Sequence, residues 1–365
     1  MTDIRIVDCG VSIRNPKFET RNGFTSHQSQ RIQGVGVIRC SAPGRAGIIG
    51  NPTDMYGGSV ISCSTQERAT VTVEPWDALV LEISGETTRL RGKEDLELSH
   101  DYFDIARTVI EFLALSDAQF KLTAESDIPF QAGLSGSTAM LVAILHALLV
   151  FSEKPCHRFR AAEMVRHIEL NYLKVVCGYQ DAYMCTFGGL HYMDFREKEF
   201  YRGLREEPYG TMESLAPYVN QLPFVLAHTG VQRISGTVHK PIRERWLEGD
   251  RKVVRGYLRM AHLARMGKKA VLDRNWEWLG ELMIENHEIQ RDLGGSGQQN
   301  EALIETALNC GALGAKLAGA GRGGTIIALH PDPEEMIAAL KKAGAARIMT
   351  PKPTAGVTVE VVDGE

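Results

Sequence analysis

The stretch PFQAGLSGSTA at residues 129–139 places glycine and serine directly before a strongly apolar stretch that begins at Thr138. The apolar stretch predicts a buried helix, and the first N–H groups of a helix have no backbone acceptor within it. These groups and the helix dipole favour an anion such as phosphate, and glycine lets an anion approach the backbone closely. The stretch therefore predicts a phosphate-binding turn or, alternatively, a flexible turn before a serine-capped helix. The candidate phosphate contacts are Gly133, Leu134, Ser135, Gly136, Ser137 and Thr138.

Two further glycine-rich segments lie on either side of this stretch in the sequence. Residues 43–58 read PGRAGIIGNPTDMYGG, and we expect a strand that runs into a glycine-rich turn. Residues 316–325 read KLAGAGRGGT, which is either a tight helix-to-strand connection or, because Arg322 lies in its middle, a second phosphate contact. No GxxxxGK[ST] pattern occurs, so the chain is not a P-loop NTPase. The GxG at residues 34–36 lacks the rest of a dinucleotide fingerprint, which leaves a Rossmann-type oxidoreductase as a weak alternative.

The composition is that of an ordinary globular protein, with 44% hydrophobic and 24% charged residues. The formal net charge of -4 gives no basic excess, so we expect no nucleic-acid partner and no membrane partner. The seven cysteines are odd in number and form no CxxC pair, which favours reduced thiols over disulfides or a zinc site. The N-terminus has no apolar signal-peptide core, and the apolar run at residues 139–151 is too short to span a bilayer. We therefore expect a cytoplasmic protein.

The domain organisation follows from length and from a change in composition. At roughly 150 residues for each domain, a chain of 365 residues suggests two domains. Residues 1–35 are assigned to a polar N-terminal arm because they are largely polar and aperiodic. The composition changes near residues 203–215, and we place the boundary there, between domains at residues 36–208 and 209–365.

The three glycine-rich segments together resemble, in order and spacing, the three motifs of the GHMP kinases, the family of galactokinase, homoserine kinase, mevalonate kinase and phosphomevalonate kinase. The central family motif is close to P-x-x-x-G-L-x-S-S-A, and the last is a G-A-G-x-G-G loop, which reads GAGRGG here. The resemblance covers about residues 36–365. It implies an α+β fold of two domains, the first like ribosomal protein S5 domain 2 and the second ferredoxin-like. It also implies ATP and Mg²⁺, with ATP and substrate meeting between the domains.

Within that family, four stretches resemble the glucuronokinases: GNPTDMYGG, IPFQAGLSGSTA, GYQDAYMCTFGGLHYMDF and SGTVHKPIRERWLEGD. This resemblance implies a sugar or uronic acid substrate that is phosphorylated at its anomeric hydroxyl. Asn51 and Pro52 replace the Glu and His of the galactokinase G-E-H-T-D stretch, which argues against galactose. Residues 287–291 carry a single arginine where glucuronokinases carry a run of them, so the identity of the sugar stays open.

The family resemblance also implies roles for individual residues. Asp181 matches the catalytic aspartate, and Arg45 matches the arginine that pairs with it. Ser137 matches the serine that contacts Mg²⁺, and Glu169 lies twelve residues before Asp181, as the metal-binding glutamate does in galactokinases. The implied phosphate contacts also include Gly321 and Gly323 of the last segment. The implied substrate contacts are Asp54, Tyr56, Gly57 and Arg233.

Other activities remain possible on this sequence. One is a regulator that binds nucleotide or sugar on the kinase fold without turnover. The presence of Asp181, Arg45 and Ser137 favours an enzyme over such a regulator. Another is a mevalonate-type kinase or diphosphate decarboxylase on the same fold, against which the GNPTDMYGG segment favours a sugar. The sequence does not give the oligomeric state.

Overall fold

The structure is a computed structural model. It describes residues 4–6, 36–129, 131–154, 156–198, 202–219, 221–231, 235–319 and 321–362, and for residues 4–6 and 235–240 it describes the backbone alone. Most of the predicted N-terminal arm lies outside the described residues. The exception is strand β1 (Ile4–Ile6), which pairs with β13 (Thr358–Val362) in an antiparallel arrangement.

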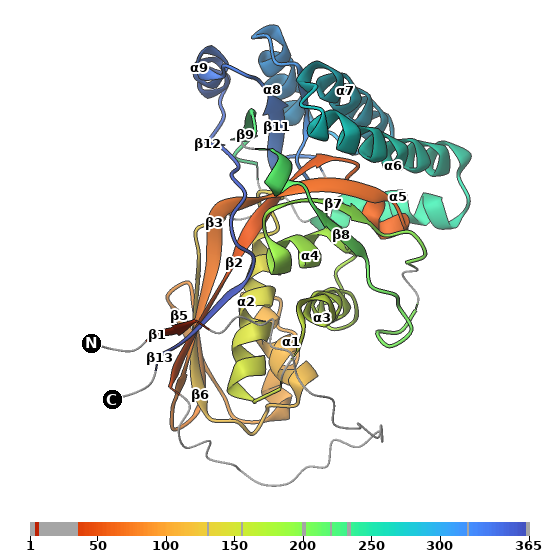
Figure 1. Ribbon diagram of the computed structural model, residues 1–365. Helices are drawn as coiled ribbons and strands as arrows, with labels where there is room; N and C mark the ends of the chain where they lie inside the picture. Colours follow the sequence, from red (N-terminus) through yellow and green to blue (C-terminus); the bar gives the residue numbers. More distant parts are fainter. Residues whose placement is uncertain are drawn as a thin grey trace.

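A nine-stranded sheet forms the body of the first half of the chain (Figure 1). Its main path runs β1-β13-β2-β3-β6-β4-β5, and β7 pairs with β3 and β8. All of its pairs are antiparallel except β4 with β6. The strands not yet given bounds are β2 (Val37–Ile49), β3 (Ser59–Pro75), β4 (Leu79–Ile83), β5 (Glu86–Leu90), β6 (Phe120–Ser126), β7 (Leu190–Asp194) and β8 (Thr211–Ser214).

Strand β2 extends far into the first glycine-rich segment. Residues 43–49 continue β2 beside β3, with register shifts at Pro43/Arg45 and Gly47/Ile49, and the expected turn follows from residue 50. A Cβ on Gly44 would lie 2.7 Å from Leu134 O, and a Cβ on Gly47 would lie 2.9 Å from Ala318 O. These glycines therefore allow neighbouring backbones to approach a strand, rather than permitting the strand to turn.

Four helices cover one face of this sheet (Figure 1). The second of them is apolar on all sides, because it is buried between the sheet and the other helices. They are α1 (Asp104–Leu113), α2 (Gly136–Phe151), α3 (Arg158–Asn171) and α4 (Gln180–Phe187). Short 3₁₀ helices occur at η1 (Thr53–Tyr56), η2 (Lys93–Leu96) and η3 (Ala216–Tyr218).

The second half of the chain builds a four-stranded antiparallel sheet in the order β10-β11-β9-β12. Along the chain, one strand, a set of helices, two strands, a helix and a final strand succeed one another, which is the ferredoxin-like arrangement. The predicted α+β fold is confirmed. The elements are β9 (Phe224–His228), α5 (Ser235–Leu247), α6 (Arg251–Leu272), α7 (Trp276–Asp292), α8 (Gln298–Asn309), β10 (Gly314–Leu317), β11 (Thr325–Leu329), α9 (Glu334–Lys342) and β12 (Arg347–Met349).

The two sheets do not divide the chain at a single point. Strands β8 and β13 both follow residue 208, where we placed the domain boundary, yet both pair within the nine-stranded sheet. Helix α6 packs against β3 and β2 as well as against α7. The seam between the halves is therefore built from segments that are far apart in the sequence.

Candidate active site

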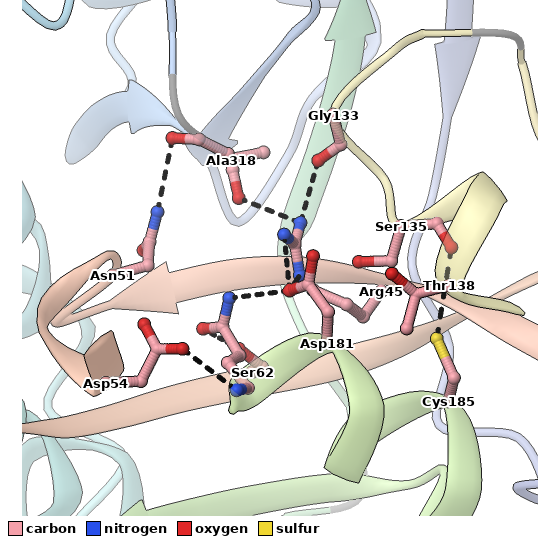
Figure 2. Close-up of polar contacts among 12 residues, drawn as sticks. Arg45, Asn51, Asp54, Ser62, Gly133, Ser135, Thr138, Asp181, Cys185 and Ala318 are labelled. Carbon is pink, nitrogen blue, oxygen red and sulfur yellow. Dashed lines mark hydrogen bonds and ion pairs between the residues drawn. The ribbon is translucent and has the colours of Figure 1, made fainter. Parts of the chain in front are cut away.

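The three glycine-rich segments meet at this seam (Figure 2). Gly47 N donates to Ala318 O at 3.0 Å, which joins the first segment to the third. Thr325 Oγ1 donates to Ala132 O at 2.9 Å, which joins the third segment to the second. Three segments that lie far apart in the sequence thus surround one place in the fold.

Arg45 links all three segments from its position on β2. Its backbone N–H donates to Leu134 O at 3.0 Å, and its side-chain Nη1 donates to Gly133 O at 2.7 Å and to Ala318 O at 3.5 Å. Its Nε donates to Asp181 Oδ1 at 2.7 Å, and Nη2 lies 2.7 Å from the same oxygen. The guanidinium is therefore fixed by two backbone carbonyls and delivers its charge to one carboxylate (Figure 2).

Asp181 stands in the first turn of α4, where the helix dipole favours a negative charge. Burial raises the pKa of this carboxyl, but the charge and hydrogen bonds of Arg45 outweigh burial and hold the pKa below its usual value. The Asp181 side chain remains 32% exposed, whereas the Arg45 side chain is 7% exposed. The Asp181 carboxylate is thus ionised and accessible, and it is held by the fixed Arg45 guanidinium.

The N-terminus of α2 lies next to this pair. Its N-cap residue Ser135 adopts a left-handed backbone conformation with φ of 62°, and no side chain caps the helix. Ser137 in the first turn is exposed, and neighbouring Thr138 is buried. An exposed, uncapped helix start of this kind can bind an anion such as a phosphate group.

Glu169 lies beneath this helix start. Its Oε1 accepts a hydrogen bond of 2.6 Å from Thr138 Oγ1, while its buried Oε2 has no hydrogen-bond partner among the described residues. Burial raises the pKa of Glu169 to about 7. Mg²⁺ is commonly held by one or two carboxylates together with substrate phosphates, so the unpartnered oxygen and the Ser137 hydroxyl fit a Mg²⁺ site. No group of three His, Cys, Asp or Glu side chains in the described ranges could hold a metal by itself.

Asp54 occupies an unexpected position. It is only 4% exposed, and its Oδ2 accepts hydrogen bonds from the backbone N–H groups of Tyr179 at 2.7 Å and Gln180 at 2.9 Å. It therefore caps the start of α4, two residues before Asp181. Burial raises the pKa of Asp54, and the charge of Asp181 adds to that rise. The substrate-binding role expected for Asp54 remains a prediction beside this capping role.

Two other expected substrate contacts, Tyr56 and Gly57, lie at the end of η1. Tyr56 packs against Trp246 and Tyr257, with ring centroids 4.5 Å and 4.7 Å away. Gly57 ends η1 with φ of 71°, a conformation that favours glycine. Arg233 lies outside the described residues.

The last glycine-rich segment is more tightly occupied than the sequence suggests. Gly323 N donates to Asn300 Oδ1 at 2.6 Å, so this N–H group is not free for phosphate. A Cβ on Gly321 would lie 1.8 Å from Gly295 O, so glycine is required there by close packing. Arg322 Nε donates to Gly294 O at 3.0 Å, so this part of the side chain also bonds within the protein.

Sequence reasoning missed Lys316, the first residue of that segment. Its side chain is fully buried, and Nζ donates to Asn51 Oδ1 at 2.8 Å and Leu317 O at 2.5 Å. Burial lowers the pKa of Lys316 to about 7, and the charge of Arg45 contributes. A single lysine in the short, otherwise uncharged strand GAKL was the available signal. Asn51 thus ties the first segment to the third.

Three family profiles match parts of this chain. The profile of the GHMP kinases N terminal domain matches residues 104–189, and that of the GHMP kinases C terminal domain matches residues 268–347. The galactokinase galactose-binding signature matches residues 28–75. The matched regions contain all of α1 to α4, strands β10 and β11 of the second sheet and the whole of β2.

Individual proteins are similar over nearly their full length. Glucuronokinase 1 of Arabidopsis thaliana is 29% identical, over 85% of this chain and 90% of its own. The mevalonate kinase of Pyrococcus abyssi is 27% identical, over 89% of this chain and 98% of its own. The crystal structure of Lactococcus lactis galactokinase with galactose superimposes with a TM-score of 0.73 at 18% identity, over 88% of this chain and 95% of that one.

Within the part of the chain that the structure describes, no helix has the length and apolar character needed to cross a membrane. The family profiles and the fold both assign the chain to one enzyme family, whose members use ATP and Mg²⁺. The chain belongs to the GHMP kinase family and is an ATP-dependent small-molecule phosphotransferase.

Proposed function

We propose that this chain transfers the γ-phosphoryl group of ATP to a sugar or sugar acid, with the anomeric hydroxyl as acceptor and a sugar 1-phosphate as product. The observation that carries the proposal is the Asp181 carboxylate, held 2.7 Å from Arg45 beside the uncapped start of α2. The carboxylate suits a hydroxyl acceptor, and the neighbouring anion site suits a phosphoryl donor. The match to the galactose-binding signature and the similarity to a glucuronokinase support a sugar acceptor.

In this mechanism the protein supplies position and charge. The first N–H groups of α2 bind phosphate oxygens of ATP, and Ser137 and Glu169 are the residues that would hold Mg²⁺. Bound Mg²⁺ neutralises charge on the phosphate groups. Asp181 accepts a hydrogen bond from the sugar hydroxyl and takes its proton as the new O–P bond forms and the bond to ADP breaks. Arg45 stabilises negative charge on the transferring group.

The pKa of Asp181 bears on how this carboxylate acts. Because Arg45 holds that pKa below its usual value, Asp181 is ionised at neutral pH and is a weak base. Phosphoryl transfer passes through a loose transition state in which little proton removal is needed early. An ionised carboxylate that orients the hydroxyl and receives its proton late fits that requirement.

A mevalonate-type kinase is the second candidate, because the Pyrococcus abyssi mevalonate kinase is similar over 89% of this chain. A regulator without turnover would share the binding site but not the transfer reaction. One assay distinguishes both of these alternatives from a sugar kinase.

The experiment is a screen for ADP release with Mg-ATP over free hexoses, pentoses, uronic acids and mevalonate. The expected result is ADP release that one free sugar or uronic acid stimulates, and that the Asp181→Asn variant lacks. Stimulation by mevalonate instead would replace the sugar assignment. Binding of Mg-ATP without stimulation by any acceptor would favour the regulator.

A further inference from the structure

A buried charged cluster surrounds Tyr179, the residue immediately before α4. We call it the Tyr179 cluster, and its charged members are Glu163 and Arg166 of α3 together with Lys198 and Glu207 of the segment after β7. None of these residues touches Asp181 in the described contacts. The cluster nonetheless holds the residue from which α4 starts, two positions before Asp181.

Lys198 is the centre of the cluster. Its side chain is 0% exposed, and Nζ lies 2.7 Å from Glu163 Oε1 and 3.8 Å from Glu207 Oε2. Nζ also donates to Pro208 O at 2.7 Å. With Arg166, the cluster has two positive and two negative side chains, so its net charge is zero. Burial of charges is tolerated when they are paired in this way, and removal of one partner is costly.

Tyr179 is held by this cluster on its ring and on its hydroxyl. The Arg166 Cζ atom lies 4.5 Å from the ring centroid and Lys198 Nζ lies 4.4 Å from it. The Tyr179 hydroxyl donates to Glu207 Oε1 at 2.7 Å. One turn further along α4, the Tyr183 hydroxyl donates to Glu163 Oε1. The ring, the hydroxyl and, through Asp54, the backbone N–H of Tyr179 are thus all fixed.

We propose that Lys198, through its contacts with Glu163, Glu207 and the Tyr179 ring, is a positioning residue that sets the start of α4 and so holds Asp181 against Arg45. The inference rests on the proposed function for its effect on catalysis. A helix is stiff over one turn, so a shift of Tyr179 displaces Asp181 from the 2.7 Å contact with Arg45. A misplacement of about 1 Å in a phosphoryl-transfer site can cost about 10²-fold in rate.

Arg107 provides a matched control for a purely structural cluster. It is also a buried cation paired with two carboxylates, Asp101 at 2.7 Å and Asp104 at 2.8 Å, and its Cζ lies 5.7 Å from the Phe103 ring centroid. It belongs to α1, which carries none of the candidate active-site residues. Loss of Arg107 should therefore cost stability without moving Asp181.

The test compares Lys198→Met with Arg107→Met in the full-length protein. Three measurements are made: thermal unfolding, the pH dependence of kcat and KM, and hydrogen exchange of the backbone at residues 178–183. Both variants should unfold at lower temperature. Only Lys198→Met should lower kcat, by about 10- to 10²-fold, with the KM for Mg-ATP nearly unchanged, and only it should speed exchange at the start of α4.

The pH profile separates positioning from general destabilisation. If Asp181 moves away from Arg45, burial is no longer offset and the pKa of Asp181 rises. The acidic limb of the kcat profile should therefore move to higher pH in Lys198→Met and stay in place in Arg107→Met. Equal stability loss in both variants, with unchanged kcat, acidic limb and exchange in Lys198→Met, overturns the proposal.

Two outcomes need separate treatment. If the wild-type enzyme transfers phosphate to no sugar, the proposed function fails, and the exchange measurement alone decides whether Lys198 fixes the start of α4. If Lys198→Met does not fold, Lys198→Gln takes its place, because it keeps a polar side chain while it removes the charge that pairs with Glu163 and Glu207. That variant should show a several-fold loss of kcat with the same direction of pH shift, and wild-type values for both would overturn the proposal.

Discussion

The starts of helices α2 and α4 lie together at the candidate active site. They differ in whether a side chain accepts hydrogen bonds from their first backbone N–H groups. No side chain caps α2, and exposed Ser137 stands in its first turn. A carboxylate of the protein itself caps the start of α4, because Asp54 Oδ2 accepts hydrogen bonds from the backbone N–H groups of Tyr179 and Gln180. Both helix starts favour a negative charge. At α4 the Asp54 carboxylate supplies it, whereas the start of α2 remains available to an anionic ligand. The start of α4 also carries Asp181, the carboxylate that we propose as catalytic.

The largest expected effect comes from removing the charge at α4. Asp181→Asn is nearly isosteric, so the fold and Mg-ATP affinity should be kept, although stability should fall because buried Arg45 loses its carboxylate partner. Turnover should fall by about 10²–10⁴-fold. Arg45→Ala should also lower turnover, because positive charge near the phosphoryl group is lost. The double variant should lose less than the product of the single losses, since groups that act as a unit are not additive. Steady-state kinetics on all three variants, with thermal melts for folding, gives the answer.

A second prediction makes α2 resemble α4. Ser137→Asp places a carboxylate at the open helix start, where it competes with phosphate. Like charges near 4 Å repel by about 4 kcal/mol at an effective dielectric constant near 20, and solvent screens part of this, so the affinity for ATP measured without Mg²⁺ should fall by about 10²-fold. The same charge should stabilise the folded protein by about 0.3–1 kcal/mol. Calorimetric titration and unfolding measure both, with neutral Ser137→Asn as the control. Unaltered affinity for Mg²⁺-free ATP in Ser137→Asp would place the phosphates elsewhere.

A third prediction disturbs the cap of α4 without changing Asp54. A Cβ on Gly178 would lie 1.9 Å from Asp54 Oδ2, so Gly178→Ala must push the cap aside. Overpacking of this kind costs about 1–3 kcal/mol of stability, and we expect about a tenfold loss of kcat because Asp181 moves with the helix start. Gly203→Ala is the matched control, because a Cβ there meets nothing within 4 Å. Wild-type kcat in Gly178→Ala would mean that the cap does not position Asp181.

The smallest predicted effect concerns pH and Glu169, whose pKa burial raises to about 7. The ionised carboxylate is the form that binds Mg²⁺, so the apparent Mg²⁺ affinity should fall about threefold from about pH 7.5 to about pH 6.5. Without Mg²⁺, the folded state holds this proton more tightly than the unfolded chain, so the unfolding free energy should decrease as pH rises from 4.5 towards 7. Glu169→Gln should remove both dependences. Equal pH dependence in that variant would exclude Glu169 from the metal site.

The resemblance to the GHMP kinases implied the α+β fold, and the apolar run after the central motif predicted helix α2. The sequence did not predict that Gly44 and Gly47 allow close contacts with Leu134 and Ala318, which lie far away in the sequence. The cap that Asp54 provides and the buried environment of Lys316 were missed for the same reason. Side chains such as these acquire their partners only when distant segments pack together.

The clearest test of the account follows phosphorus by NMR in the wild type and in Asp181→Asn, each with Mg-ATP and the best acceptor from the screen. The account predicts that the wild type converts the γ-phosphate signal of ATP into a sugar phosphate whose phosphorus couples to the anomeric proton. Asp181→Asn should leave the spectrum nearly unchanged over the same time while it still binds Mg-ATP. Coupling to a C6 proton would refute the anomeric assignment, and equal conversion by a well-folded Asp181→Asn protein would contradict the mechanism.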